Sequence, residues 1–357
     1  MKYNGQHPTE SRRSARVLRE RSVLGGQGEP IWSVAFSPEG DTLATASEDG
    51  CVTLWDLASE KERLRIRAHS LGANAVAFAP HGELLASAGE DATVRLWHPG
   101  RGKPLARFTG FHGGVNALAF SPDGRTVAAG GGQLNAAGEL VVFDLDHARQ
   151  RHALHGHANE ILSLHYSPDG AALASGDFDG TIHIWDLTLG TALHTLRGHL
   201  SAVWSLAFAP KGLLLFSGGD DGCLRVWGAH TGRCLATLSA SEFGTLALAH
   251  APDDGSLVTG SFDGALRLWD TSALEERHMI GRHDKSVFAA AYAPDGKTLA
   301  TAGVDGVIKL WDCAPAPRAR SARIAPGTAA MFRSGSQEFT GKSWPENRLL
   351  RHIDRVW

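Results

Sequence analysis

Cysteine is scarce in this chain, and its placement excludes two common uses of the residue. The 357 residues contain 4 cysteines: Cys51 and Cys223 stand at equivalent positions of two repeated segments, and Cys234 and Cys313 are solitary. None follows the spacing of a metal-ligand motif, and the set does not form the framework of a disulfide-rich scaffold. We expect reduced thiols, as in proteins of the cytosol or nucleus.

Long hydrophobic runs are also missing. No uninterrupted apolar segment is long enough to span a bilayer, and residues 1–21, MKYNGQHPTESRRSARVLRER, are polar and basic rather than a secretory signal. These absences predict a cytoplasmic or nuclear protein, neither secreted nor held in a membrane. The 42 glycines and 15 prolines, in contrast, indicate many turns between short strands.

The dominant feature of the sequence is an internal repeat. The segments TLWDL, RLWHP, VVFDL, HIWDL, RVWGA, RLWDT and KLWDC place an aromatic residue at seven positions: Trp55, Trp97, Phe143, Trp185, Trp227, Trp269 and Trp311. Successive gaps are 42 residues, except for one of 46 before Phe143, where the extra residues lie within GGGQLNAAGEL. A turn of the SPDG type begins eighteen residues before six of these aromatics.

Each repeat reads as four short strands. Apolar residues alternate with a period of two just before the first turn, as in Val34-x-Phe36 and Val76-x-Phe78, which is typical of half-buried strands. A second apolar run, an Asp-Gly type hairpin turn and the strand ending at the aromatic follow. A further apolar residue stands thirty-one positions before most of the aromatics and marks an outer strand. Four strands per repeat predict the blade of a β-propeller.

These repeats resemble the WD40 family over residues 17–312. The family's Gly-His element appears as Gly156-His157 and Gly198-His199, and its Trp-Asp element is intact in four repeats, for example at Trp55-Asp56. The first, third and sixth repeats depart from the Gly-His element, and the third displaces its histidine to His112. The resemblance implies an all-β, seven-bladed propeller with four antiparallel strands per blade, closed by the N-terminal strand.

The closing strand can be located from its register. A propeller that does not close leaves an open sheet edge, which invites aggregation. Leu24 lies thirty-one residues before Trp55, the spacing of the other outer strands. We therefore predict that residues 17–24 pair with the strand that carries Trp311.

Four repeats contain a histidine, a serine or threonine, an aspartate and a tryptophan at fixed offsets. The sets are His69, Ser87, Asp91, Trp97; His157, Ser175, Asp179, Trp185; His199, Ser217, Asp221, Trp227; and His283, Thr301, Asp305, Trp311. Their composition is that of Ser-His-Asp hydrolase triads. A nucleophile, however, needs one activated site with an oxyanion hole rather than four copies. The resemblance implies instead a buried structural network within each blade.

The remaining polar clusters predict no catalytic site, no metal site and no cofactor. The histidines around residues 147–157 lack a second ligand pattern for zinc, so His147, His152 and His155 are interpreted as incidental surface residues. The glycines of GGGQLNAAGEL lack the Lys-Ser/Thr of a nucleotide-binding loop. We therefore expect a protein that is not an enzyme.

The resemblance also implies a peptide-binding rim around the central channel. By analogy its side chains are Trp32, Glu48, Asn74, Glu90, Asn116, Glu160, Leu162, Phe178, Trp204, Asp220, Leu246, Phe262 and Phe288. This rim is unusually apolar for solvent-facing positions, and exposed apolar patches mark interaction sites. Its acidic residues favour a partner segment with Arg or Lys beside aliphatic residues. Alternatively, the aromatics pack against one another or are capped by the tail of the chain.

Charge divides the chain into three parts. Residues 1–21 carry six Lys/Arg against two acids and residues 313–357 eight against three, which leaves 21 basic and 33 acidic residues between them. The acidic body disfavours binding of duplex nucleic acid. We interpret residues 1–16 as a basic flexible segment and residues 313–357 as a basic tail. A short amphipathic helix is predicted near residues 344–357, where apolar residues share one face: Leu349, Leu350, Ile353 and Trp357.

These features lead to two hypotheses for function. The first is a non-catalytic interaction scaffold: a monomeric propeller within a hetero-complex that binds other proteins through its rim and its C-terminal tail. The second is an adaptor or sensor that reads a basic or modified peptide, as in chromatin or ubiquitin-ligase recognition. A reader of modifications needs an enclosed pocket at the rim, whereas a scaffold needs only a broad patch.

Overall fold

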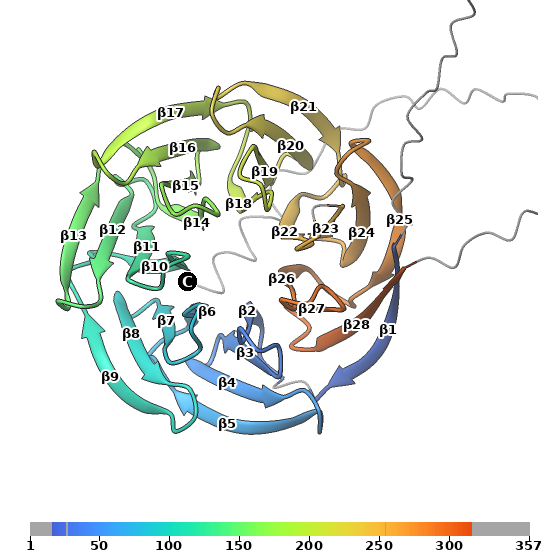
Figure 1. Cartoon of the computed structure of the whole chain (residues 1–357), viewed down its shortest axis with the longest axis horizontal. Coiled ribbons are helices and arrows are strands. Elements are labelled where there is room, and N and C mark those ends of the chain that lie inside the picture. Colours follow the sequence, from blue (N-terminus) through green and yellow to red (C-terminus); the bar gives the residue numbers. More distant parts are fainter. Residues whose placement is uncertain (1–15, 26–27, 254, 316–357) are drawn as a thin grey trace, which may run out of the picture. The chain divides into compact units, whose positions relative to one another are not determined.

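The computed structural model describes residues 16–25, 28–253 and 255–315, which form seven four-stranded antiparallel sheets arranged in a ring (Figure 1). The seven-bladed WD40-type architecture expected from the repeats is thereby confirmed. None of the described residues belongs to a helix long and apolar enough to cross a membrane. The helix expected near residues 344–357 lies outside the described residues.

The strands of the first four blades run in chain order from the centre to the perimeter. They are β2 (Ile31–Phe36), β3 (Thr42–Ser47), β4 (Cys51–Asp56) and β5 (Lys61–Arg67); β6 (Ala73–Phe78), β7 (Leu85–Gly89), β8 (Thr93–His98) and β9 (Lys103–Phe108); β10 (Gly114–Phe120), β11 (Thr126–Gly132), β12 (Glu139–Asp144) and β13 (Arg149–Leu154); and β14 (Ile161–Tyr166), β15 (Ala172–Asp177), β16 (Thr181–Asp186) and β17 (Thr191–Arg197).

The last three blades follow the same order, and the seventh takes its outer strand from the beginning of the chain. They are β18 (Val203–Phe208), β19 (Leu214–Gly219), β20 (Cys223–Gly228) and β21 (Cys234–Ser239); β22 (Thr245–His250), β23 (Ser256–Ser261), β24 (Ala265–Asp270) and β25 (Glu275–Arg282); and β26 (Val287–Tyr292), β27 (Thr298–Gly303), β28 (Ile308–Pro315) and β1 (Arg16–Leu24).

The predicted closure of the ring is confirmed. Strand β1 lies outside β28 in Figure 1 and pairs with it antiparallel, from Arg16↔Pro315 to Leu24↔Ile308. Leu24 is only 1% exposed and joins a core cluster with residues of the first and seventh blades. Hydrogen bonds and apolar burial therefore both hold the two ends of the propeller together.

The hydrophobic core lies between the blades rather than within them. One cluster joins Val52 and Leu54 of the first blade with Val76, Leu85 and Trp97 of the second. The other clusters repeat this arrangement around the ring, and the repeated aromatic of each blade is buried at such a contact. Because a single sheet cannot bury both of its faces, each blade depends on its two neighbours.

Antiparallel pairing gives the ring two distinct faces. The first-to-second and third-to-fourth strand turns of each blade lie at one end, here called the turn face. The second-to-third strand loops and the connections to the next blade lie at the other, here called the rim face. On the turn face, the glycine of the SPDG-type turn takes positive φ in every blade except the sixth, as at Gly170 (72°), where a side chain would be strained.

Every outer strand contains a bulge next to the repeated aromatic of its blade. In the fifth blade, for example, Val226 pairs with Ala236 and Trp227 with Cys234, so Leu235 has no partner residue in the register. The bulged residues, in blade order from the first, are Arg63, Leu105, Arg151, Leu193, Leu235, Arg277 and Arg21. Bulges of this kind twist an exposed edge away from further strand pairing.

Candidate functional site

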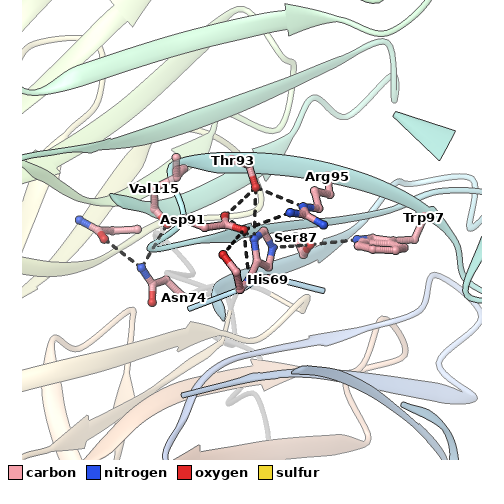
Figure 2. Close-up of polar contacts among 10 residues, drawn as sticks. His69, Asn74, Ser87, Asp91, Thr93, Arg95, Trp97 and Val115 are labelled. Carbon is pink, nitrogen blue, oxygen red and sulfur yellow. Dashed lines mark hydrogen bonds and ion pairs between the residues drawn. The ribbon is translucent and has the colours of Figure 1, made fainter. Parts of the chain in front are cut away.

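The catalytic-looking residues form closed hydrogen-bond sets inside the blades. In the second blade, His69 Nδ1 lies 2.8 Å from Asp91 Oδ1, and its Nε2 lies 2.8 Å from Ser87 Oγ (Figure 2). Trp97 Nε1 donates to the same hydroxyl at 2.9 Å. The sets of the fifth and seventh blades have the same bonds: His199, Ser217, Asp221, Trp227, and His283, Thr301, Asp305, Trp311.

The pKa shifts in this set favour a neutral histidine and an ionised aspartate. Burial lowers the pKa of His69 despite its bond to Asp91. Burial opposes ionisation of Asp91, but hydrogen bonds from Thr93 and His69 lower its pKa to about 2. The hydroxyl of Ser87 already has two partners, and its side chain is inaccessible to solvent. Such a set stabilises a blade rather than presenting a nucleophile.

The fourth blade departs from the expected set. His157 Nδ1 contacts Asp177 Oδ2 at 2.7 Å, not Asp179, so the assignment of Asp179 to this network is wrong. Other blades have a glycine or serine at the position of Asp177; at Gly89 a Cβ atom would lie 2.7 Å from the His69 ring. Asp177 occupies that space, so its carboxylate reaches the histidine first. Asp179 instead accepts from Asn159 Nδ2 at 3.0 Å.

The remaining members of the fourth-blade set form the expected bonds. His157 Nε2 lies 2.5 Å from Ser175 Oγ, and Trp185 Nε1 donates to Ser175 at 2.7 Å. Asn159 connects Asp179 to the third blade: its Oδ1 accepts from the backbone N–H of Asn135, within the extra segment of that blade. Through Asn159, Asp179 therefore helps to anchor the longer loop between β11 and β12.

The third blade replaces the polar set with aromatic packing. Phe111, rather than His112, occupies the histidine position, and its ring lies 6.3 Å from that of Phe143. Phe108 stacks on Phe143 at 4.4 Å, and Ala129 stands where the other blades have a hydroxyl. His112 is exposed, and its backbone N–H donates to Glu139 at 2.9 Å. Exchanging the histidine, the hydroxyl and the indole for apolar groups avoids an unsatisfied buried group.

The other candidate metal ligands are dispersed. His147 pairs with Asp144 at 3.0 Å, and His155 is exposed. His152 lies half-buried on β13. Within the described ranges, no three His, Cys, Asp or Glu side chains are placed to hold a metal ion.

The rim residues lie at one end of the propeller. Seven come from equivalent positions near the start of the inner strands: Trp32, Asn74, Asn116, Leu162, Trp204, Leu246 and Phe288. The loops between second and third strands contribute Glu48, Glu90, Phe178, Asp220 and Phe262, and Glu160 stands just before β14. Most are half-buried, but Leu246 and Glu160 are buried.

Aromatic residues gather on one side of the rim. The ring of Phe288 lies 4.9 Å from Trp32, 5.7 Å from Trp204 and 6.0 Å from Phe262, each at an interplanar angle above 80°. The alternative of self-packed aromatics is therefore realised here, although these rings remain half-exposed. Each indole also donates to a rim acid: Trp32 to Glu48 at 2.6 Å, and Trp204 to Asp220 at 2.8 Å.

The opposite side of the rim is polar. Asn74 Nδ2 donates to Asn116 Oδ1 at 3.2 Å, and Asn116 Nδ2 donates to Glu160 Oε2 at 3.4 Å. These bonds connect the second, third and fourth blades. The rim thus has an aromatic cluster over the fifth, sixth, seventh and first blades and a chain of amide hydrogen bonds over the second, third and fourth, where Leu162 and Phe178 add apolar surface.

The four rim acids share one electrostatic feature. Burial raises the pKa of Glu48, Glu90, Glu160 and Asp220. For Glu48, the nearby charge of Glu90 raises the pKa further. These carboxylates have lost water without gaining a full set of cationic partners, and a positive charge placed beside them would stabilise their ionised forms.

Further exposed apolar residues, which the sequence did not predict, lie in loops of the rim face. Leu71, Leu134, Leu200 and Phe243 lie in rim-face loops, and Leu200 is 87% exposed. Three of them follow within two residues of the position that holds histidine in the second, fourth, fifth and seventh blades. That recurrence is the signal that could have identified them. They widen the apolar area available to a partner.

Comparison with known proteins agrees with the geometry. A family model described as "WD domain, G-beta repeat" matches seven segments: 19–56, 60–98, 102–134, 148–186, 190–228, 232–270 and 275–312. Over 37 residues the chain is 49% identical to human striatin-4, which covers 10% of this chain and 5% of that protein. Over 51 residues it is 41% identical to small ribosomal subunit protein RACK1z of Arabidopsis thaliana, covering 14% and 16%. The seven matched segments, which together extend through all seven blades, show that the chain belongs to the WD40-repeat family.

Proposed function

We propose that this protein is a non-catalytic scaffold, a subunit of a multiprotein complex, that binds a basic and aliphatic segment of a partner on its rim. The observation that supports this most directly is the contact of two desolvated carboxylates, Glu48 and Asp220, with the indoles of the aromatic cluster. A lysine or arginine would meet negative charge there, and its aliphatic stem would meet aromatic rings. The exposed apolar loops would contact the flanking residues.

A scaffold accounts for the polar sets better than an enzyme. WD40 propellers are generally non-catalytic interaction scaffolds. Each histidine of the four sets already contacts a carboxylate and a hydroxyl, in buried positions repeated around the ring. The name of the Arabidopsis relative places that protein in the small ribosomal subunit, a large assembly. Because the match covers a small part of that relative, it supports only the general idea of a complex subunit.

The packing of the aromatics bears on the alternative of a modification reader. Such a reader encloses a quaternary ammonium group in a cage of aromatic faces. Here three rings meet Phe288 edge-on, so aromatic contacts already occupy the space between them. This arrangement favours a broad patch over an enclosed pocket, and we therefore favour the scaffold.

The test removes rim charge without removing the aromatics. Glu48→Gln/Glu90→Gln keeps the side-chain shapes and the acceptor for Trp32 but deletes two negative charges. The matched control is Glu83→Gln, an exposed acid in the turn between β6 and β7 on the opposite face. We expect affinity purification with mass spectrometry to lose a stoichiometric partner for the double variant and to retain it for the control.

A truncated chain separates the rim from the tail. A variant ending at residue 315 keeps every described strand but lacks the basic tail. If the partner is lost only in this variant and remains with Glu48→Gln/Glu90→Gln, the tail is the main binding surface and the proposed rim site is wrong. Retention of the partner by both variants would place binding elsewhere on the propeller.

A further inference from the structure

The perimeter of the fourth and fifth blades is the one place in the described ring where two adjacent blades both have leucine at the bulge of the outer strand. Four blades have arginine at this bulge, and three have leucine: the isolated Leu105 of the second blade, and Leu193 and Leu235 of the adjacent fourth and fifth blades. Leu193 and Leu235 are about half exposed, at 51% and 55%. Leu189 and Leu213, in turns of the same two blades, are also exposed. We call these four residues the leucine patch. An exposed patch of large apolar side chains marks an interaction site.

A groove lies beside the leucine patch. It has a volume of about 620 Å³ and is lined on its apolar surface by Pro168, Ile184, Leu193, Phe208, Pro210 and Ala229. Residues of the turns between β14 and β15 and between β18 and β19 contribute to its walls, so it opens on the turn face. The groove and the patch are therefore separate from the rim.

The two walls of the groove differ in charge. Asp169, Asp186 and His194 line the wall from the fourth blade, and Lys211 and His230 line the wall from the fifth. The two carboxylates therefore belong to one blade and the lysine to the next. A surface with this arrangement is complementary to itself when it is rotated by a half turn.

The edge strand next to the patch is also unusual. Strand β21, CLATLS, has no charged residue, whereas each of the other six outer strands contains at least one arginine. Charged side chains on an edge strand oppose association with a second edge. In the fifth blade this protection depends on the bulge alone.

We propose that a second copy of this chain docks on the leucine patch through a two-fold interface, with the fourth blade of each copy facing the fifth blade of the other. A two-fold interface requires one patch that is complementary to itself. Leucines would meet leucines, and Asp169 and Asp186 of one copy would face Lys211 and His230 of the other. In a two-fold interface formed by blades that have arginine at the bulge, the arginines of the two copies would lie close together and repel each other.

This inference goes beyond the proposed function and departs from the expectation of a monomeric propeller. Because the patch lies toward the turn face, both rims stay accessible in the dimer. Two rims on one particle would bind a bivalent partner more tightly than either rim alone.

The test measures mass in solution and uses substitutions that the fold already accommodates. Light scattering coupled to size exclusion, run on the full chain over a concentration series, should approach twice the monomer mass of 38.0 kDa. Leu193→Arg/Leu235→Arg should remain monomeric at every concentration. Arginine occupies the same bulge in four other blades, so this variant should keep the melting temperature of the wild type. The matched control is Leu105→Arg, at the exposed bulge of the second blade.

Three outcomes would overturn the proposal. A wild-type chain that is monomeric throughout the series removes the dimer. A dimer that persists in Leu193→Arg/Leu235→Arg uses another surface. Dissociation by Leu105→Arg as well would show that added charge, not this patch, controls association. Glu48→Gln/Glu90→Gln should leave the mass unchanged, which distinguishes failure here from failure of the rim proposal.

Discussion

Asp177 Oδ2 lies 2.7 Å from His157 Nδ1, in the role that Asp91, Asp221 and Asp305 have in three other blades. The aspartate has moved two residues along the chain, from the turn to the end of β15, and it is only 1% exposed there. The hydrogen bond of the histidine is kept while the residue that supplies it has changed. The network is therefore defined by geometry rather than by a fixed sequence offset.

This exchange predicts different costs for two neighbouring aspartates. Asp177→Ala should lower the free energy of unfolding by about 1–3 kcal/mol, because it leaves a buried histidine nitrogen without its partner. Asp179→Ala should change it by no more than about 0.5 kcal/mol, since Asp179 is exposed. Urea denaturation of the two variants measures the difference. Equal losses would show that Asp177 has no special role.

The tryptophan of the same blade allows a graded test. Trp185→Phe removes the donor to Ser175 but keeps most of the ring, and it imitates the natural Phe143. We expect the free energy of unfolding to fall by about 1–3 kcal/mol, because the buried hydroxyl of Ser175 loses the hydrogen bond that the indole donates. Trp185→Ala adds a cavity and should cost about 3–5 kcal/mol. Thermal or urea unfolding should rank wild type above Trp185→Phe above Trp185→Ala; any other order contradicts the assigned packing.

A companion substitution checks why the third blade tolerates phenylalanine. Combining Trp185→Phe with Ser175→Ala removes both the donor and the hydroxyl, as in the pair Phe143 and Ala129. Because His157 would then lack a partner for Nε2, we expect the double variant to recover none of the lost stability. Recovery of stability in the double variant would mean that the unsatisfied hydroxyl of Ser175 is the only cause of the loss.

The sequence predicted what the spacing of the repeat determines and missed what depends on distances between side chains in space. The spacing of Trp55 and its six equivalents is enough to locate the blades, and the register of Leu24 locates the closing strand, because both are set within one repeat length. The partner of His157 was misassigned since an offset cannot tell which carboxylate comes nearer in space. The contacts of Phe288 with Trp32 and Trp204 were left open for a different reason: they join residues of different blades.

Ring closure leads to a test with a sharp boundary. Deleting residues 1–24 removes all of β1, exposes the edge of β28 and should cause aggregation, because an unpaired edge recruits other chains. Deleting residues 1–15 is the control, since it keeps β1 intact. Size exclusion should show soluble protein of native stability for the control and loss of that species for the longer deletion. A soluble, stable chain after the longer deletion would mean that another segment completes the seventh blade.

The rim acids should make partner binding sensitive to mild acid. Burial raises the pKa of Glu48 and Glu90 above that of an ordinary glutamate, so they take up protons at a higher pH. Binding of an arginine- and leucine-rich peptide should therefore weaken as the pH falls, before exposed carboxylates titrate. Calorimetry at several pH values measures this trend. Glu48→Gln/Glu90→Gln should bind more weakly at neutral pH and show a flatter profile, whereas a parallel profile would exclude these two acids as its origin.

His183 predicts how the stability of the fourth blade depends on pH. Burial, followed by the nearby charge of His157, lowers its pKa from 6.5 to about 4. Between these values the unfolded chain binds a proton that the folded chain does not, so stability falls as the pH drops from 6.5 toward 4. At about 1.4 kcal/mol per pKa unit, the loss from this residue approaches about 3 kcal/mol. His183→Gln, which cannot titrate, should remove that part of the dependence. Urea midpoints measured at roughly pH 7.5, 6, 5 and 4, a range that spans these two pKa values, should fall less steeply with decreasing pH for the variant than for wild type. If the two proteins lose stability in parallel over the whole range, His183 is not a source of the acid sensitivity.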